Sequence, residues 1–489
     1  MTKAEKKAFK LYAKRSSSAE PLFIKLFDIL DNKPLSEDNY VIKALKLNSA
    51  SKYSNLKGNL YLQILQSLRI LKVKKLPNIN IRNHIDMSYV LYDKGLYMQA
   101  LKVLEHAKSL CHKYGTEMSL LTILEIEKTI HSRHITRMTP SSFNELISNV
   151  VEVSSSITKR VELSNLKMLL HRKYISKGHL KSKTELKELT KFFFSQINNY
   201  DYKKLKPYEK IYYCQCHVWY YFVIQEYKEC QTFAIKWVDI FLDNQDLPKR
   251  DYNLFLRGYH YVLTASYNIG DKDTHDNFLI SLEALRLSQY KKFNKNNKIY
   301  SFLYVHTGRF NKAFLDKNFE YGLDCIPKTL KRIKRYKLNL DQHKVMVLHY
   351  KIAWTYICAL KPNKAIPYLE GIIKMQKQSL REDIQSNTRL IHLIALYDQS
   401  KYNTVGLCLK RYKYYFNKAK EVNKLQELTL KYFQDLIITP LLERNEIHYK
   451  FYKKLIDLKN SSLNQRSFLY LDIIFWVEKF IPPTKHQFS

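Results

Sequence analysis

The stretch YVLYDKGLYMQALKVLEHA, from Tyr89 to Ala107, decides the fold class. Gly95 separates two segments with helical spacing of their apolar residues, and glycine readily adopts the left-handed backbone conformation that a tight turn between helices needs. After the turn, Ala100, Leu104 and Ala107 share one helix face, because they are four and three residues apart. The stretch therefore predicts two antiparallel helices that approach closely through small side chains.

A scarcity of helix-breaking residues extends this prediction to the whole chain. The 489 residues include 10 glycines and 12 prolines, well below the typical usage of about 7% and about 5%. Leu, Lys, Glu, Gln and Ala are spread throughout and favour helix interiors. No run of 18 or more apolar residues occurs, so no membrane-spanning segment is predicted. We expect an all-α protein with almost no strand.

The Gly95 stretch resembles the tetratricopeptide (TPR) repeat. Repeats of that family pair two antiparallel helices, with a small residue in the first helix, a turn glycine, an aromatic residue after it, and two small residues in the second helix. In this sequence those positions correspond to Ser88, Gly95, Tyr97, Ala100 and Ala107. The resemblance implies a helical repeat fold that binds other proteins.

The pattern recurs along the chain with less regular residues. YVHTGRFNKAF predicts a second turn at Gly308 and Phe310, followed by Ala313 in the next helix. IAWTYICALKPNKAIPYLEGI provides Ala353 in a first helix and Ala365 in a second. The turn positions, near 97, 227, 272, 310, 362 and 402, are separated after the second by 45, 38, 52 and 40 residues, where a regular TPR array repeats every 34.

These intervals favour an elongated, right-handed α-solenoid of antiparallel helix pairs with lengthened repeats. We expect the TPR-like solenoid over residues 80–430 and capping helices over residues 431–489. Residues 1–79 contain four helical patterns without the turn signature. They are interpreted as an N-terminal helical cap, since a terminal repeat must cover its open apolar face, or as a small basic helical domain.

Aromatic residues mark one face of the expected solenoid. In the TPR family the first helix of each pair lines the concave side, so the resemblance places there a set of residues spread over the first helices: Tyr89, Tyr92, Trp219, Phe222, Phe302, Tyr350, Trp354 and Tyr397. Aromatic side chains provide large contact areas with few rotatable bonds. We predict a protein-binding scaffold whose groove holds a peptide or a partner helix; the alternative is that these residues form the core.

Positive charge suggests a second function. The formal net charge is +37, and Lys328, Lys331, Arg332 and Arg335 form one stripe at helical spacing. Residues 286–340 contain fourteen lysines and arginines against three acidic residues. Such a stripe fits an acidic protein partner or the phosphates of a nucleic acid. The alternative is solvated helix surface in a lysine-rich chain.

The nucleic-acid hypothesis also includes the N-terminal region. Residues 1–75 contain sixteen lysines and arginines and six acidic residues, and their helices could form a module like a helix-turn-helix. No recognisable turn sequence supports that module. The oligomeric state is not predicted.

Candidate catalytic and metal-binding residues are few. No glycine-rich phosphate loop, G-x-S-x-G motif or kinase-type motif occurs, so we expect neither an enzyme nor a cofactor. Cys214 and Cys216 are two residues apart and would point to different sides of a helix. Glu127, His131 and His134 lie on one helical face and form the weak candidate for a metal site, with an ordinary polar surface as the alternative.

The N-terminal sequence and the cysteines predict a cytoplasmic protein. MTKAEKKAFKLYAKR is charged from its third residue and lacks the apolar segment of a secretory signal. The seven cysteines are odd in number and scattered, which is typical of reduced thiols in the cytosol.

Overall fold

The computed structural model describes residues 1–15, 21–32, 37–133, 140–177, 179–180, 183–244, 246–336, 339–375, 382–418, 422–460, 468 and 471–481. Over these residues the regular structure is helical and no strand occurs, which confirms the all-α prediction. The chain divides into two compact units, Met1–Lys159 and Arg160–Ser489. Among the described residues no helix is both long and apolar enough to cross a membrane.

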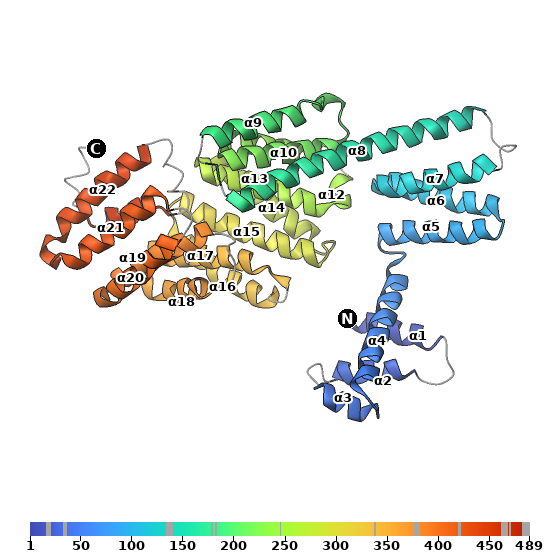
Figure 1. Cartoon of the computed structure of the whole chain (residues 1–489), viewed down its shortest axis with the longest axis horizontal. Coiled ribbons are helices and arrows are strands. Elements are labelled where there is room, and N and C mark those ends of the chain that lie inside the picture. Colours follow the sequence, from blue (N-terminus) through green and yellow to red (C-terminus); the bar gives the residue numbers. More distant parts are fainter. Residues whose placement is uncertain are drawn as a thin grey trace. The chain divides into compact units, whose positions relative to one another are not determined.

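Unit 1 contains two small cores. Its helices are α1 (Lys3–Ala13), α2 (Leu22–Asn32), α3 (Asp38–Ala44), α4 (Ala50–Lys72), α5 (Pro77–Asp93), α6 (Tyr97–Tyr114), α7 (Glu117–Arg133) and the first part of α8 (Pro140–Lys177) (Figure 1). Phe9 and Leu26 are buried between α1, α2 and α4, whereas Ile81, Leu104 and Ile123 are buried between α5, α6 and α7. The expected boundary at residues 79 and 80 falls near the start of α5.

The Gly95 stretch forms a helix hairpin from α5 and α6. Gly95 adopts φ +73°, and its amide donates to the carbonyl of Tyr92 over 2.9 Å. Ser88, Ala100 and Ala107 are fully buried, so their small side chains allow the helices to approach. Tyr97 packs edge-on against Tyr92 with ring centroids 5.4 Å apart and covers the turn.

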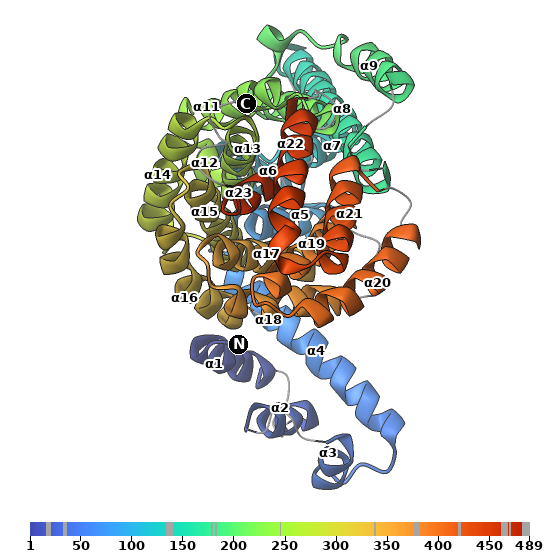
Figure 2. The ribbon, with the colours of Figure 1, turned by 90° about the vertical axis from the view of Figure 1, so that its left-hand side faces the viewer.

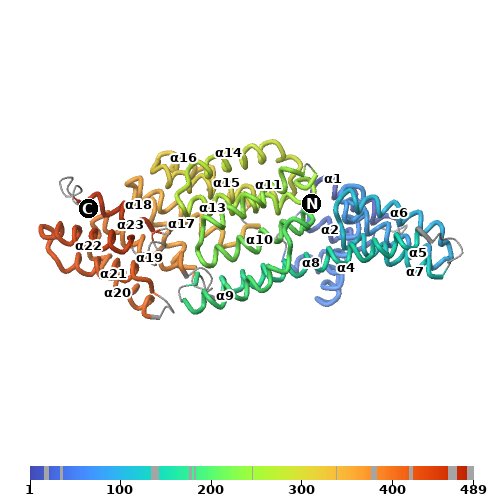
Figure 3. Tube along the Cα trace, turned by 90° about the horizontal axis from the view of Figure 1, so that it is seen from above, coloured from blue at the N-terminus to red at the C-terminus, as the bar shows by residue number. Residues whose placement is uncertain are grey.

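Unit 2 repeats this hairpin geometry. Its elements after α8 are α9 (Lys183–Ile197), η2 (Tyr202–Lys204), α10 (Pro207–Ile224), α11 (Tyr227–Leu242), α12 (Leu247–Arg250), α13 (Tyr252–Ile269), α14 (Lys272–Gln289), α15 (Lys295–Leu315), α16 (Phe319–Tyr336), α17 (Gln342–Cys358), α18 (Pro362–Ile373), α19 (Glu382–Tyr397), α20 (Tyr402–Lys418), α21 (Lys424–Ile438), η4 (Leu441–Glu443), α22 (Arg444–Asn460) and α23 (Ile473–Glu478). The helices from α10 to α22 follow one another in chain order (Figure 3).

One backbone feature sets the frame of the repeat. A residue with positive φ lies two residues before the second helix of each of five pairs: Gln225 (+65°), Gly270 (+78°), Lys317 (+53°), Leu360 (+56°) and Ser400 (+56°). The second helices begin at residues 227, 272, 319, 362 and 402 and are therefore 45, 47, 43 and 40 residues apart. Unit 2 is built from lengthened helix pairs of nearly constant size.

The predicted turn at Gly308 and Phe310 is wrong. Both residues lie inside α15, and the turn occurs at Lys317. Gly308 is small for a packing reason, because a Cβ there would approach Leu279 Cδ1 to 2.9 Å. Phe310 and Ala313 are fully buried in the same helix. The turn escaped the sequence pattern because a lysine adopts the left-handed conformation that usually indicates glycine.

The helix pairs of unit 2 form a curved array, which confirms the α-solenoid prediction. Figure 2 shows the first helices α13, α15, α17 and α19 on the inside of the curve and the second helices α14, α16, α18 and α20 on its outside. Each first helix also packs against the next, from α13 to α21. Residues 431–489 contribute the end of α21, then α22, and finally α23, which lies within the curve (Figure 2).

Candidate partner-binding site

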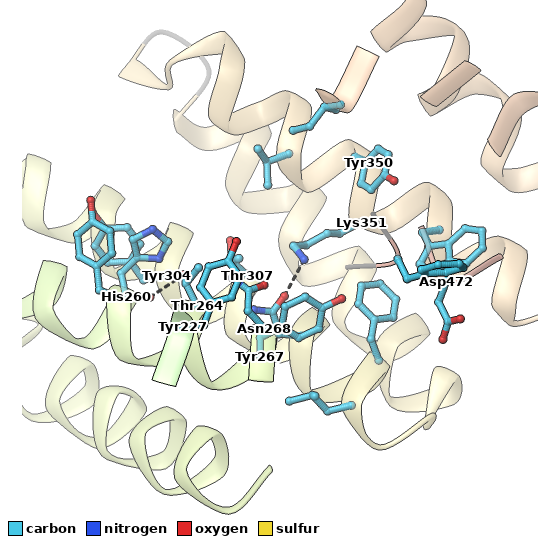
Figure 4. A pocket seen from close by; sticks show the side chains of 18 of the residues that line it. Tyr227, His260, Thr264, Tyr267, Asn268, Tyr304, Thr307, Tyr350, Lys351 and Asp472 are labelled. Atoms are coloured by element: carbon cyan, nitrogen blue, oxygen red, sulfur yellow. Dashed lines mark hydrogen bonds between the residues drawn. The ribbon is translucent and has the colours of Figure 1, made fainter. Parts of the chain in front are cut away.

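A cavity of about 540 Å³ opens on the concave side of unit 2. Its walls come mainly from α10, α13, α15 and α17, and its far end is formed by residues next to α23. Figure 4 shows His260, Thr264, Tyr267 and Asn268 from α13 facing Tyr350 and Lys351 from α17. Tyr304 and Thr307 from α15 lie between these two groups (Figure 4).

Aromatic rings supply most of the cavity surface. At one end Trp219 packs against His171 and Tyr174, with centroids 4.5 and 5.9 Å apart. Deeper inside, His260 and Tyr304 stack at 4.4 Å with an interplanar angle of 9°. Rings already held by other rings lose little conformational entropy when a ligand binds. The wall is therefore preorganised for apolar contact.

Lysines provide the charge of the cavity. Lys351 Nζ donates to Asn311 Oδ1 over 2.6 Å and lies 5.0 Å from the Tyr267 ring. Lys344 and Lys317 also line the cavity, over the rings of Tyr300 (4.2 Å) and Phe475 (5.6 Å). Asp472 is the one acidic residue among the described residues that line it. The cavity therefore has an excess of positive charge.

The ionisation of buried groups reflects this charge. Burial, followed by the nearby Lys344 and Arg257, lowers the pKa of His260 to about 3. Burial and Arg257 also lower the pKa of Lys344. His260 is therefore neutral at physiological pH, and the cavity favours an anionic ligand over a cationic one.

The C-terminal helix α23 closes one end of the concave surface. Trp476 Nε1 donates to both carboxylate oxygens of Asp398, over 3.1 and 3.0 Å, and Lys479 Nζ donates to the same carboxylate over 2.5 Å. The Trp476 ring lies 6.0 Å from the Tyr397 ring, and Phe475 lies 5.1 Å from Phe319. An apolar helix of this chain therefore already lies on the inner helices.

The structure brings four of the eight predicted groove residues to the cavity: Trp219, Phe222, Tyr350 and Trp354. Two others are placed differently, because Phe302 is fully buried in the core and Tyr397 is packed under α23. Tyr89 and Tyr92 lie on α5 in unit 1, where Tyr89 is 49% exposed and the Tyr92 hydroxyl accepts from Arg133 Nη1 over 2.6 Å.

Other lining residues were not predicted. Tyr174, His260, Tyr267 and Tyr304 reach the cavity, and so does the lysine Lys344. Their helical spacing alone resembles that of core residues, so no local pattern distinguishes them. Only Tyr227, identified as a turn aromatic, carried a sequence signal.

The predicted basic stripe lies on α16 and does not line the cavity. Lys328, Lys331 and Arg335 are exposed, whereas Arg332 is half-buried. Ile326 on the opposite face is 2% exposed and packs in the core. The amphipathic helix thus packs and still presents positive charge.

The candidate metal residues are engaged otherwise or lie outside the described residues. Glu127 is buried and pairs with Lys108 Nζ over 2.8 Å. His131 is nearby on α7, and burial lowers its pKa. His134 lies outside the described residues. Over the part of the chain that the structure describes, no group of three His, Cys, Asp or Glu side chains could hold a metal ion.

The geometry defines an α-solenoid of TPR-like helix pairs. No protein-family model matches the chain, and no curated protein matches it. One similar solved structure is the crystal structure of the P58(IPK) TPR domain at 2.5 Å, with 13% sequence identity and a TM-score of 0.24, over 73% of this chain and 98% of that one.

Proposed function

We propose that the protein is a non-enzymatic scaffold in the cytosol that binds an acidic peptide segment of a partner protein in the concave cavity of unit 2. The observation that carries this proposal is the lining of the cavity, in which aromatic rings and three lysines surround a space of about 540 Å³ with one acidic side chain. All seven cysteines are free, in agreement with a reducing compartment.

The lysines favour an acidic ligand. Lys344 and Lys317 have aromatic neighbours, and among the described residues neither forms an ion pair. A carboxylate entering the cavity would meet these ammonium groups in a partly desolvated place, where an ion pair is stronger than at an open surface. The aromatic walls would hold the apolar side chains next to the carboxylates.

Helix α23 supports a partner segment with apolar residues. Ile473, Ile474 and Val477 are buried, and Trp476 adds an indole that is 3% exposed. The inner helices therefore hold a short apolar segment by rings and by an anchoring polar bond. A partner segment in the adjacent cavity would use the same kinds of contact.

A displayed peptide library selected on the full chain tests the proposal. We expect enrichment of peptides that combine acidic with aromatic or aliphatic residues. Thr264→Trp and Thr307→Trp place an indole inside the cavity and should weaken binding at least about tenfold, which corresponds to about 1.4 kcal/mol. Thr232→Trp, at an exposed position of α11 outside the cavity, is the matched control and should leave affinity unchanged. Equal affinities for all three variants would contradict the proposed site.

The exposed cations of α16 favour a second candidate, binding to nucleic acid. Lys328, Lys331 and Arg335 could contact phosphates without entering the cavity. This function predicts a steep dependence of affinity on salt concentration and no effect of cavity-filling substitutions.

A further inference from the structure

A second set of cations gathers where α14, α15 and α16 pack together. Arg286 comes from α14, Arg309 from α15 and Arg332 from α16. Arg309 is satisfied, since its Nε donates to Glu283 Oε1 over 2.6 Å. The buried Nε of Arg286 and the buried Nη1 of Arg332 have no hydrogen-bond partner among the described residues. Two guanidinium groups therefore keep unused donors within the protein.

The surroundings of these donors are positively charged. Burial and then the charge of Arg332 lower the pKa of Arg286. Burial, followed by Arg309, Arg286, Arg332 and Lys328, lowers the pKa of the buried His306 to about 3. Glu283 is already paired with Arg309. The positive field at this place is not neutralised by the chain.

Two tyrosines complete the site. The hydroxyls of Tyr290 and Tyr336 are 3.4 Å apart, and the Arg286 guanidinium lies 5.8 Å from the Tyr290 ring centroid. Lys298 Nζ lies 5.0 Å from the same ring on α15. Hydroxyl and ammonium donors thus accompany the two guanidinium groups.

The empty arrangement is unfavourable by itself. A buried donor without an acceptor loses its hydration without gaining a bond, and two like charges in a partly desolvated place repel. A tetrahedral dianion would remove both penalties, because its oxygens accept several bonds and its charge offsets the repulsion. Arginine matches the geometry of phosphate oxygens with pairs of N–H donors.

We propose that Arg286 and Arg332 bind a phosphate monoester, with Lys328 adding charge at the exposed side. The phosphate group belongs either to a small molecule or to a phosphorylated side chain. The site is separate from the concave cavity, since neither arginine lines it.

Calorimetric titration of the full chain with inorganic phosphate, O-phosphoserine and a phosphoserine peptide tests the proposal, at constant ionic strength maintained with chloride. Arg286→Gln and Arg332→Gln should each weaken phosphate binding at least about tenfold. Lys331→Gln removes an exposed charge from the same helix and should change the affinity less than about twofold.

Thermal unfolding in chloride alone verifies that each variant folds. If Arg332→Gln does not fold, Arg332→Lys keeps the charge without the paired donors and should still weaken binding. Tighter binding of the phosphopeptide than of O-phosphoserine would identify a protein-borne phosphate, and equal affinities would identify a small ligand. No heat with any phosphate compound, or the same affinity in Arg286→Gln and wild type, would overturn the proposal. Binding of the acidic peptide should be unchanged in Arg286→Gln, so the two sites fail or succeed independently.

Discussion

The fifth residue after each positive-φ turn is the point at which paired helices come closest. It is buried in all six pairs that share this turn: Ala100, Cys230, His275, Gly322, Ala365 and Val405. The sequence predicts this position where the residue is alanine, because a small residue at helical spacing from a turn is recognisable. It does not predict His275 or Gly322, because burial at this position constrains size and packing, while the chemical class of the side chain varies.

Replacing the buried alanines with a large residue should overpack these contacts. We expect Ala100→Phe and Ala365→Phe each to lower the free energy of unfolding by about 1–3 kcal/mol. Ala284→Phe, at an exposed position of α14, serves as the control and should change it by less than about 0.5 kcal/mol. Urea denaturation measures all three, and wild-type midpoints for the first two variants would show that the helices do not pair through these residues.

Gly322 provides a sharper case at the same position. A Cβ at Gly322 would approach Thr355 Cγ2 to 2.8 Å and Ala313 Cβ to 3.2 Å. The Thr355 side chain is β-branched and donates to the Lys351 carbonyl over 2.8 Å, so it moves with difficulty. Gly322→Ala should therefore destabilise the protein even though alanine favours helices by about 1 kcal/mol over glycine.

Gly371→Ala is the matched comparison, since a Cβ there meets no atom within 4 Å and should stabilise unit 2 by up to about 1 kcal/mol. Thermal unfolding of both variants decides. A melting temperature of Gly322→Ala at or above that of Gly371→Ala would contradict the close approach of α16 and α17.

At the scale of elements, the helix pairs were predictable and the exact turns were less so. Apolar spacing and the shortage of glycine and proline identify helices wherever they occur. Turns with Gly95 and Gly270 carry a local signal, whereas Lys317, Leu360 and Ser400 adopt positive φ without one. Helix α23 is the clearest limit, because its apolar residues predict burial but cannot specify that it packs against inner helices more than seventy residues earlier.

The packing of α23 predicts a large effect at Trp476. Trp476→Ala removes a buried indole and leaves Asp398 with one fewer donor, so the free energy of unfolding should fall by about 3–5 kcal/mol. Trp476→Phe retains most of the ring contact and should lose less. Hydrogen exchange should show faster exchange in α19 as well as in α23 for the alanine variant. Unchanged stability and exchange would mean that α23 does not pack against α19.

At the scale of the whole molecule, composition predicts the fold class, but the candidate site depends on unit 2 as an assembled array. Trp219 and Tyr350 are 131 residues apart in the chain and line one cavity because the intervening pairs stack in order. Their aromatic character could be noticed in the sequence. Which of the many aromatic residues face the cavity, and which are buried like Phe302, follows only from the curvature of the array.

The buried histidines give unit 2 a defined response to acid. Burial lowers the pKa of His217 and His392 to about 4 and contributes to a pKa of about 3 for His306. Because these folded-state values lie below the ordinary 6.5, the unfolded chain binds more protons between about pH 6.5 and 4. Their contribution to stability is therefore complete above about pH 6.5 and is lost as the pH falls through this interval.

Urea denaturation at pH 7.5 and pH 5.0 tests this response. Each of these histidines should reduce the free energy of unfolding by about 2 kcal/mol at the lower pH. His306→Gln should show a correspondingly smaller decrease between the two pH values. An identical decrease in His306→Gln and wild type would contradict the assignment for that residue.

The central claim is that the concave cavity of unit 2 binds an acidic protein segment, whereas the exposed charges are not the principal site. The most direct measurement compares the affinity of one selected acidic peptide and one fluorescent oligonucleotide for three proteins: wild type, Thr307→Trp, and a variant lacking Lys328, Lys331, Arg332 and Arg335. We expect Thr307→Trp to weaken peptide binding at least about tenfold, and the four-charge variant to bind the peptide like wild type. Tight oligonucleotide binding that falls steeply with salt and is lost in the four-charge variant, together with peptide binding that is unaffected by Thr307→Trp, would contradict the claim.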